Sequence, residues 1–356
     1  MTELLIGTKK GLFVLRGKEG APFANVARVF AGEPVEYAIR DPRSGRYLAA
    51  MTSAFYGPKL MLADDPAGEW REAEGIALPE EGDTALKRIW TIVAGEEDGL
   101  VYAGGDPGVL FESRDGGETW TLNRGLWDQP TRPDWSPGGG GLCLHSVVPW
   151  PGDPSRIALG ISAVGVWLSD DGGRTWRNGN AGLVPRYLPE EARQGSMDLC
   201  VHDLHRSPSR PERLFMQFHG GVYRSDDAGE SWIDVGTDTE LPSDFGFPML
   251  ADPDDPDSAY VIPLSADLDR VTPDGHVRVY ETRDAGASWI ERGDGLPAEN
   301  AYLTILRQAF DREGAGGSMG LYFGATSGDV FGSGDAGRTW FTAATKLPPV
   351  YSVRVA

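Results

Sequence analysis

The chain has 356 residues, and its 53 acidic residues outnumber its 33 basic ones to give a net charge of −20. A surface this acidic repels phosphate backbones and anionic lipid, which argues against nucleic acid and membranes as partners. The sequence shows no signal peptide, no run near the roughly 18 apolar residues of a membrane helix, and too few cysteines for a disulfide framework. We therefore expect a globular protein in the cytoplasm.

Short apolar runs separated by turn residues predict strands from the N-terminus onward. The segment "ELLIGTKKGLFVL" (3–15) predicts the second and third strands of a four-stranded unit, and "FANVARVF" (23–30) predicts the fourth. Near the other end, four strands are predicted in "YLTILRQAF", "GLYFGATS", "DVFGSG" and "TWFTAA". The C-terminal "VYSVRVA" (350–356) is an orphan first strand, and we expect it to complete the N-terminal unit and remove a free sheet edge.

An eight-residue pattern recurs five times along the chain. The copies are "SRDGGETW" (113–120), "SDDGGRTW" (169–176), "SDDAGESW" (225–232), "TRDAGASW" (282–289) and "SGDAGRTW" (333–340), and "ADDPAGEW" (63–70) is a degenerate sixth. Ser and Asp side chains bond nearby main-chain amides and Gly accepts positive φ, so the pattern predicts a turn followed by a packed Trp.

Four short strands in each period indicate the blades of a β-propeller. We predict one all-β domain over residues 1–356, a seven-bladed β-propeller of four-stranded antiparallel blades. The predicted blades are 1–31 with 350–356, 34–76, 87–123, 143–178, 200–236, 247–292 and 302–345.

The repeat resembles the BNR or Asp-box motif, S/T-x-D-x-G-x-T/S-W, over nearly the whole chain. That motif occurs in sialidases, xyloglucan-active glycoside hydrolases, sortilin-type receptors and photosystem II assembly factors. The segments "LHSVV", "HGGVYRSDD", "SDFGFP" and "LPPVYSVR" are similar to bacterial BNR-repeat proteins of the glycosyl-hydrolase or sialidase-like kind. The resemblance implies a hydrolase or lyase acting on a carbohydrate or other small molecule. The sialidase Phe/Tyr-Arg-Ile-Pro segment is absent, so no sialidase active site carries over.

Long connections concentrate on one face of the predicted ring, the top face, where first strands begin. They are the connections 123–142, 178–199, 237–247 and 263–276, which overhang blades 3 to 6. Long loops on a rigid scaffold are common sites of function. We therefore predict a pocket at the top of the ring in this sector.

Three of the five histidines are predicted on the same rim, and two chemistries fit them. His145, His202 and His219 have the number and type of ligands for a divalent metal such as Zn²⁺ with one position left for water or substrate. Cys143 and Cys200 precede two of these histidines and are interpreted as packing residues. The second chemistry is acid/base catalysis without metal, by the histidines or by the carboxylates of Asp106, Asp203 and Asp244.

Residues expected to contact substrate surround the same rim: Arg88, Trp135, Tyr187, Gln217 and Phe245. The alternative function is a non-catalytic propeller that holds a protein or peptide on the top face. If the protein is an enzyme, we expect a polar pocket with histidines that point inward. If it is a binding scaffold, we expect a broad face with exposed apolar patches.

Overall fold

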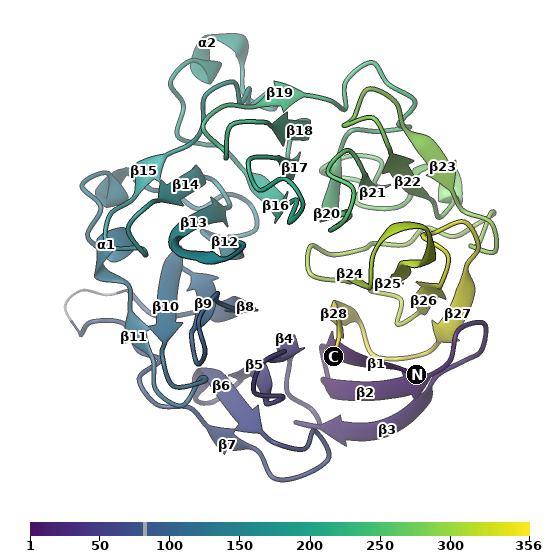
Figure 1. The fold of residues 1–356 in the computed structure, drawn as a ribbon. Coiled ribbons are helices and arrows are strands. Elements are labelled where there is room, and N and C mark those ends of the chain that lie inside the picture. Colours follow the sequence, from purple (N-terminus) through teal and green to yellow (C-terminus); the bar gives the residue numbers. More distant parts are fainter. Residues whose placement is uncertain (81–83) are drawn as a thin grey trace.

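The computed structural model describes residues 1–80 and 84–356. In these residues, seven four-stranded antiparallel sheets stand in a ring around a common axis (Figure 1). The fold is the predicted seven-bladed β-propeller. None of the helices in the described ranges has the length and apolar character needed to cross a lipid bilayer.

The first three sheets run from the N-terminus, with the innermost strand of each given first. Sheet one contains β28 (Val350–Val355), β1 (Thr2–Thr8), β2 (Gly11–Gly17) and β3 (Ala24–Val29). Sheet two contains β4 (Val35–Arg40), β5 (Tyr47–Ser53), β6 (Gly57–Ala63) and β7 (Arg71–Glu72). Sheet three contains β8 (Arg88–Ala94), β9 (Val101–Asp106), β10 (Val109–Ser113) and β11 (Thr121–Leu122).

The remaining four sheets follow the same order. Sheet four contains β12 (Leu144–Trp150), β13 (Asp153–Ile161), β14 (Gly165–Ser169) and β15 (Arg177–Asn178). Sheet five contains β16 (Val201–Arg206), β17 (Leu214–Phe218), β18 (Gly221–Ser225) and β19 (Ile233–Asp234). Sheet six contains β20 (Gly246–Ala251), β21 (Ala259–Pro263), β22 (Val279–Thr282) and β23 (Ile290–Arg292). Sheet seven contains β24 (Phe310–Glu313), β25 (Gly320–Gly324), β26 (Val330–Ser333) and β27 (Phe341–Ala344).

Helical structure is short and lies in the connections. The described residues contain α1 (Arg124–Trp127), α2 (Glu190–Arg193) and the single 3-10 turns Arg132–Asp134, Pro273–Gly275 and Gly316–Ser318. Asn123 caps α1 by accepting a 2.9 Å hydrogen bond from the Leu126 amide. Four of these five elements lie in the long connections predicted on the top face, and the fifth, Gly316–Ser318, lies between β24 and β25 of sheet seven.

The two ends of the chain share sheet one. β28 pairs antiparallel with β1, and the partners run from Leu4 with Val355 to Thr8 with Val350. This pairing places both termini side by side (Figure 1). It closes the ring as predicted, and it covers the hydrogen-bonding edge that β1 would otherwise present.

The repeated eight-residue segments form one turn, built five times with the same hydrogen bonds. In the first copy, Ser113 Oγ accepts from the Gly117 amide and Asp115 Oδ1 accepts from the Thr119 amide, both at 2.9 Å. The equivalent pairs recur at 2.7–2.9 Å in the other four copies. The predicted turn chemistry is therefore confirmed.

Each turn also joins its sheet to the preceding one. The Trp120 amide donates to Glu74 O at 2.9 Å, and Trp232 and Trp340 make the same contact at 2.8 Å with Ala181 and Asp294. The Trp side chains are buried among apolar residues from two adjacent sheets. Burial of these rings between sheets contributes to the apolar contacts that hold neighbouring sheets together.

The beginning of sheet seven differs from the prediction. "YLTILRQAF" was expected to be a single first strand, but β24 begins only at Phe310 and residues 301–306 form no strand. The segment is held instead by Gln308, which forms a parallel bridge with Ser352 and accepts a 2.9 Å hydrogen bond from the Val353 amide. The segment is apolar because it packs beside the innermost strand β28. That packing does not require the segment itself to form a continuous strand.

Candidate functional site

The top face carries two groups of buried or half-buried polar side chains. We call Cys200, His202 and His219 the imidazole cluster, and Glu36, Arg88 and Asp106 the carboxyl cluster. The imidazole cluster belongs to sheet five, and the carboxyl cluster belongs to sheets two and three. The sector in which the pocket was expected, blades 3 to 6, therefore contains one cluster and only part of the other.

The imidazole cluster contains a direct contact between two histidines. His202 Nε2 lies 3.2 Å from His219 Nδ1, and the opposite nitrogen of His202 lies 2.6 Å from the main-chain oxygen of Gly246. Burial lowers the pKa of His202 well below its usual value, and the positive charge of Arg307 lowers it further. Burial likewise lowers the pKa of His219, against the attraction of Asp267. Both rings are neutral at physiological pH, with lone pairs available.

Cys200 belongs to this cluster, although it was predicted to be a packing residue. One donor atom each from Cys200, His202 and His219 lie within 4.8 Å of one another. Burial raises the pKa of the Cys200 thiol, and Arg307 opposes that effect. Tyr187 supports the segment, because its hydroxyl accepts from the Cys200 amide at 2.9 Å and donates to Asp198 O at 2.7 Å.

His145 does not join the other two histidines, which corrects the expected three-histidine site. Its Nε2 lies 2.8 Å from Val201 O and 3.1 Å from Ser162 Oγ, and its Nδ1 lies 3.2 Å from Ser146 Oγ. Burial, with the nearby Arg307 charge, lowers the pKa of His145 to about 3. Because both nitrogens are occupied inside the protein, His145 is a structural residue between sheets four and five.

Arg307 lies near the imidazole cluster and was not predicted as a site residue. Its guanidinium lies over the Phe247 ring, 4.7 Å from the centroid, and its Nε is buried with no hydrogen-bond partner among the described residues. The charge of Arg307 also depresses the pKa values of His145, His202 and His219. The sequence could have indicated Arg307 only through its position, in a connection that enters the top of the ring beside a segment of apolar residues.

The carboxyl cluster brings two predicted residues together with one that the sequence did not indicate. Arg88 Nε lies 3.6 Å from Glu36 Oε1, and Arg88 is directly opposite Asp106 in the β8–β9 pairing. Asp106 precedes a cis peptide bond to Pro107, and its Oδ1 lies 3.8 Å from Lys87 Nζ. Glu36 could have been suspected as the single charge within the apolar inner strand "VEYAI".

Burial changes the acidity of both carboxyls. It raises the pKa of Glu36 to about 7, despite the opposing charge of Arg88. It also raises the pKa of Asp106, against the charges of Lys87 and Arg88. Glu36 Oε2 and Asp106 Oδ1 are buried and have no hydrogen-bond partner in the described residues. Two buried carboxyls with unused oxygens beside cations are typical of a catalytic or binding site.

A cleft of about 590 Å³ opens beside Asp106, beneath the connection that follows sheet three. Its lining includes Lys87, Pro107, Trp127, Arg132 and Trp135. Arg132 is stacked between the two indoles, 4.0 Å from the Trp127 centroid and 5.1 Å from the Trp135 centroid. Trp135 is mostly buried against Trp167, with centroids 5.1 Å apart, so Trp127 offers the more accessible ring.

Two other predicted residues, Gln217 and Asp203, have their polar atoms engaged within the protein. Gln217 Nε2 donates to the main-chain oxygen of Asp244 at 2.9 Å. Asp203 accepts from the amides of Leu204 and Met249 at 3.0 and 3.2 Å. Burial acts to raise the pKa of Asp203, but His205 and these hydrogen bonds outweigh it and lower the pKa. Gln217 and Asp203 therefore stabilise the inner strands.

Of the last two predicted residues, Phe245 contacts the imidazole cluster and Asp244 does not. Phe245 is buried with its ring centroid 5.3 Å from that of His219 and 5.5 Å from that of His202. The Asp244 carboxylate points to a separate ion-pair network, 3.4 Å from Arg186 Nη1 and from Thr237 Oγ1. Phe245 thus forms a wall of the cluster, whereas Asp244 faces the rim of sheet five.

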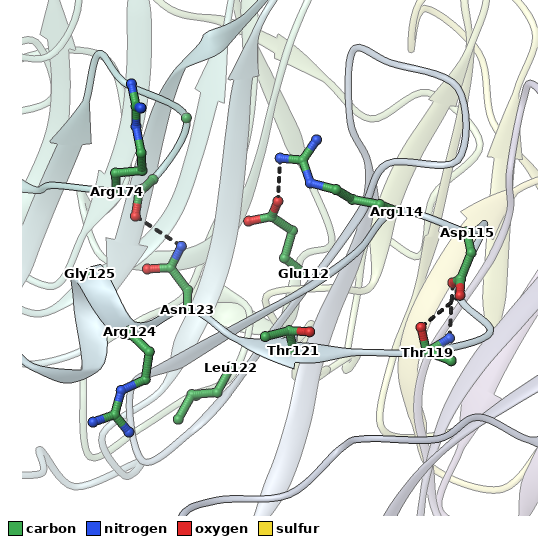
Figure 2. Close-up of a pocket in the computed structure, with 12 residues that line it drawn as sticks. Glu112, Arg114, Asp115, Thr119, Thr121, Leu122, Asn123, Arg124, Gly125 and Arg174 are labelled. Atoms are coloured by element: carbon green, nitrogen blue, oxygen red, sulfur yellow. Dashed lines mark hydrogen bonds and ion pairs between the residues drawn. The ribbon is translucent and has the colours of Figure 1, made fainter.

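A larger groove of about 640 Å³ lies elsewhere, at the outer rim beside the turns of sheets three and four (Figure 2). Its side chains are engaged with one another: Glu112 with Arg114, Asp115 with Thr119, and Asn123 with Gly173 O. These contacts belong to the repeated turns and to the cap of α1. The groove therefore has a structural explanation, and its size does not make it the site.

Comparisons with known proteins agree with the fold. No protein-family model matches the chain. A curated relative, the oligoxyloglucan-reducing-end-specific xyloglucanase of Emericella nidulans, is 25% identical over 200 residues, which are 49% of this chain and 24% of the relative. The chain thus matches about a quarter of that relative's length.

Solved structures of similar shape include enzymes and a peptide-binding protein. An ancestral GH74 enzyme has a TM-score of 0.55 at 14% identity, over 90% of this chain and 38% of its own. The GH74 enzyme of Niastella koreensis has a TM-score of 0.56 at 14% identity, over 98% and 65%. YCF48 bound to a D1 peptide has a TM-score of 0.51 at 15% identity, over 83% and 78%. At these identities the likeness establishes the architecture, a seven-bladed β-propeller.

Proposed function

We propose that the chain is a glycosidase-like hydrolase whose reaction takes place at the carboxyl cluster. The observation that carries this proposal is the pair of buried carboxyls, Glu36 and Asp106, each with one oxygen unused by the protein and with Arg88 beside both. Glycoside hydrolysis needs two carboxyls of different acidity that flank the scissile bond. The curated xyloglucanase relative and the GH74 structures support a carbohydrate as the substrate class.

The acidities of the two groups suggest their roles. Glu36, with a pKa of about 7, retains a proton near neutral pH and donates it to the glycosidic oxygen as the bond to the anomeric carbon breaks. Asp106 acts as the carboxylate partner, either removing a proton from the attacking water or bonding to the anomeric carbon. A carboxyl separation of about 5 Å selects the second course and about 6.5–9.5 Å the first. Trp127 in the adjoining cleft is positioned to stack on a sugar ring.

Turnover of a panel of aryl glycosides and oligosaccharides, xyloglucan fragments included, tests the proposal. Glu36→Gln and Asp106→Asn should each lower kcat by about 10²-fold or more, while the exposed Glu69→Gln and Asp98→Asn should retain wild-type turnover. Circular dichroism would verify that each variant is folded. Wild-type rates in both cluster variants, or the absence of turnover and of carbohydrate binding by the wild type, would reject the proposal.

A second function, a non-catalytic scaffold for a peptide or protein, is favoured by exposed apolar side chains on the top connections. Phe55 is 87% exposed, Tyr56 80%, Leu268 98% and Tyr302 62%. Exposed apolar groups of this kind mark interaction surfaces when they are contiguous. Measuring binding of the protein to an array of hydrophobic peptides tests this second function. Binding that is lost in Phe55→Ser with Tyr56→Ser, and unchanged in Glu36→Gln, would support the scaffold over the enzyme.

A further inference from the structure

We infer that Cys200, His202 and His219 bind a divalent metal ion of the Zn²⁺ class on the top face, through one thiolate and two imidazoles. This site is separate from the carboxyl cluster, and it does not depend on the proposed hydrolase activity. It also differs from the site predicted by sequence, because Cys200 takes the place of His145.

The spacing of the donor atoms fits one small ion. His202 Nε2 and His219 Nδ1 are 3.2 Å apart. Two Zn–N bonds of about 2.05 Å at a tetrahedral angle place their nitrogens about 3.3 Å apart. All three donor atoms lie within 4.8 Å of one another, so a small approach of the Cys200 sulfur and the imidazoles would bring them to the distances of a bound ion. Three protein ligands leave one position for water or a substrate atom.

The two histidines differ in the oxygen that faces their remote nitrogen. His202 Nδ1 lies 2.6 Å from Gly246 O, whereas His219 Nε2 lies 3.7 Å from Asp267 Oδ2, beyond hydrogen-bond distance. Metal-binding histidines usually donate their remote N–H to a carbonyl or carboxylate, which fixes the ring and its tautomer. His202 has such a partner, and Asp267 places a carboxylate near His219.

The contact between the two rings favours one arrangement of protons when no metal is bound. Gly246 O requires a proton on His202 Nδ1, which leaves the Nε2 lone pair directed toward His219. His219 Nδ1 then donates to that lone pair across 3.2 Å, and a metal ion bound by both nitrogens would replace this shared proton.

The surrounding charges select the kind of metal. Arg307 adds a positive charge near the cluster and therefore disfavours a cation there. Ionised Cys200 and the Asp267 carboxylate offset that charge, so the thiolate is an essential part of the site. A thiolate with two imidazoles suits Zn²⁺ or Co²⁺ and is a poor match for Mg²⁺ or Ca²⁺, which prefer oxygen ligands.

Metal binding can be measured directly on the full chain, without any assay of activity. We expect purified protein incubated with Zn²⁺ and dialysed to retain about one ion per chain, measured by plasma mass spectrometry. Co²⁺ should give tetrahedral d–d absorption and a thiolate-to-cobalt charge-transfer band. Cys200→Ala should abolish the charge-transfer band, and His202→Ala and His219→Ala should each lower affinity by at least 10-fold.

Two matched variants serve as controls. Cys143→Ala removes the other cysteine, and His276→Ala removes an exposed histidine outside the cluster. Both should bind Zn²⁺ and Co²⁺ as the wild type does. If the folded wild type retains no Zn²⁺ and shows no cobalt spectrum, the inference is wrong. It is also wrong if Cys200→Ala and His219→Ala bind as tightly as the two controls.

Discussion

The side-chain amide of Gln308 donates a 2.7 Å hydrogen bond to the main-chain oxygen of His145, which joins sheet seven to sheet four across the axis of the ring. Gln308 Oε1 in turn accepts from Arg354 Nη2 at 2.6 Å, and Arg354 Nε donates to the Tyr37 hydroxyl at 2.5 Å. This chain of contacts connects the inner strands of sheets one, two and four. Since Gln308 and Tyr37 are buried, the hydrogen bonds are shielded from competing water.

Gln308→Ala is expected to destabilise the protein by about 2–4 kcal/mol, because it leaves the His145 oxygen and the Arg354 guanidinium without this partner in a buried site. Urea unfolding monitored by tryptophan fluorescence would measure the loss. The exposed Gln194→Ala is the matched control and should change stability by less than about 0.5 kcal/mol. Equal unfolding midpoints for the two variants would show that the contact across the axis contributes nothing.

The ring itself was predictable, because five turns of fixed chemistry and the complementary chain ends specify the number of units. The entry to sheet seven was not. "YLTILRQAF" has the composition of a buried strand, and nothing local in it reveals that Gln308 will bond to residues more than 40 positions away. Only tertiary contacts distinguish a buried strand from a buried segment beside a strand.

The repeated turn supplies its own comparison between Gly and Ala at one position. Gly172 has φ of 71° in the second turn, and Ala336 has φ of 60° at the equivalent place in the fifth. An L-residue other than Gly is strained there by about 1–2 kcal/mol. Gly172→Ala should therefore destabilise the protein by about 1 kcal/mol and Ala336→Gly should stabilise it by up to that amount. Thermal unfolding of both variants tests the pair, and shifts of the same sign would contradict the explanation.

The site was less predictable than the fold, since the sequence identifies residue types on a rim and cannot assign their partners. His145 and His202 occupy similar "C-x-H" segments, yet His145 bonds to Val201 O while His202 faces His219. Likewise, the sequence marks Glu36 only as a single charge within an apolar strand, and its burial and its contact with Arg88 appear only in the structure. Arg88 and Asp106 were predicted as site residues because Arg88 lies at the start of an inner strand and Asp106 lies at a top turn of the same blade.

Glu36→Gln should change how stability depends on pH. The folded protein raises the pKa of Glu36 to about 7 from an ordinary value of 4.5, so between these values the folded state binds more protons than the unfolded state. Stability from this group is present below about pH 4.5 and is lost as pH rises through 7, by up to about 3 kcal/mol. In Glu36→Gln that decline should disappear, as measured by urea unfolding at a series of pH values. Glu69→Gln should retain it, and an unchanged decline in Glu36→Gln would assign it to other groups.

Arg88→Met should raise the pKa of Glu36 still further, because Arg88 is the cation that opposes the effect of burial on that carboxyl. Carbon-detected NMR titration of the Glu36 carboxyl gives the midpoint directly, and any pH profile of turnover should move to higher pH with it. Arg88→Lys preserves the charge and should restore part of the shift, whereas the exposed Arg124→Met should leave the midpoint near 7. A midpoint that falls or stays constant in Arg88→Met would mean that Arg88 does not act on Glu36, and the proposed difference in acidity between the two carboxyls would then need another cause.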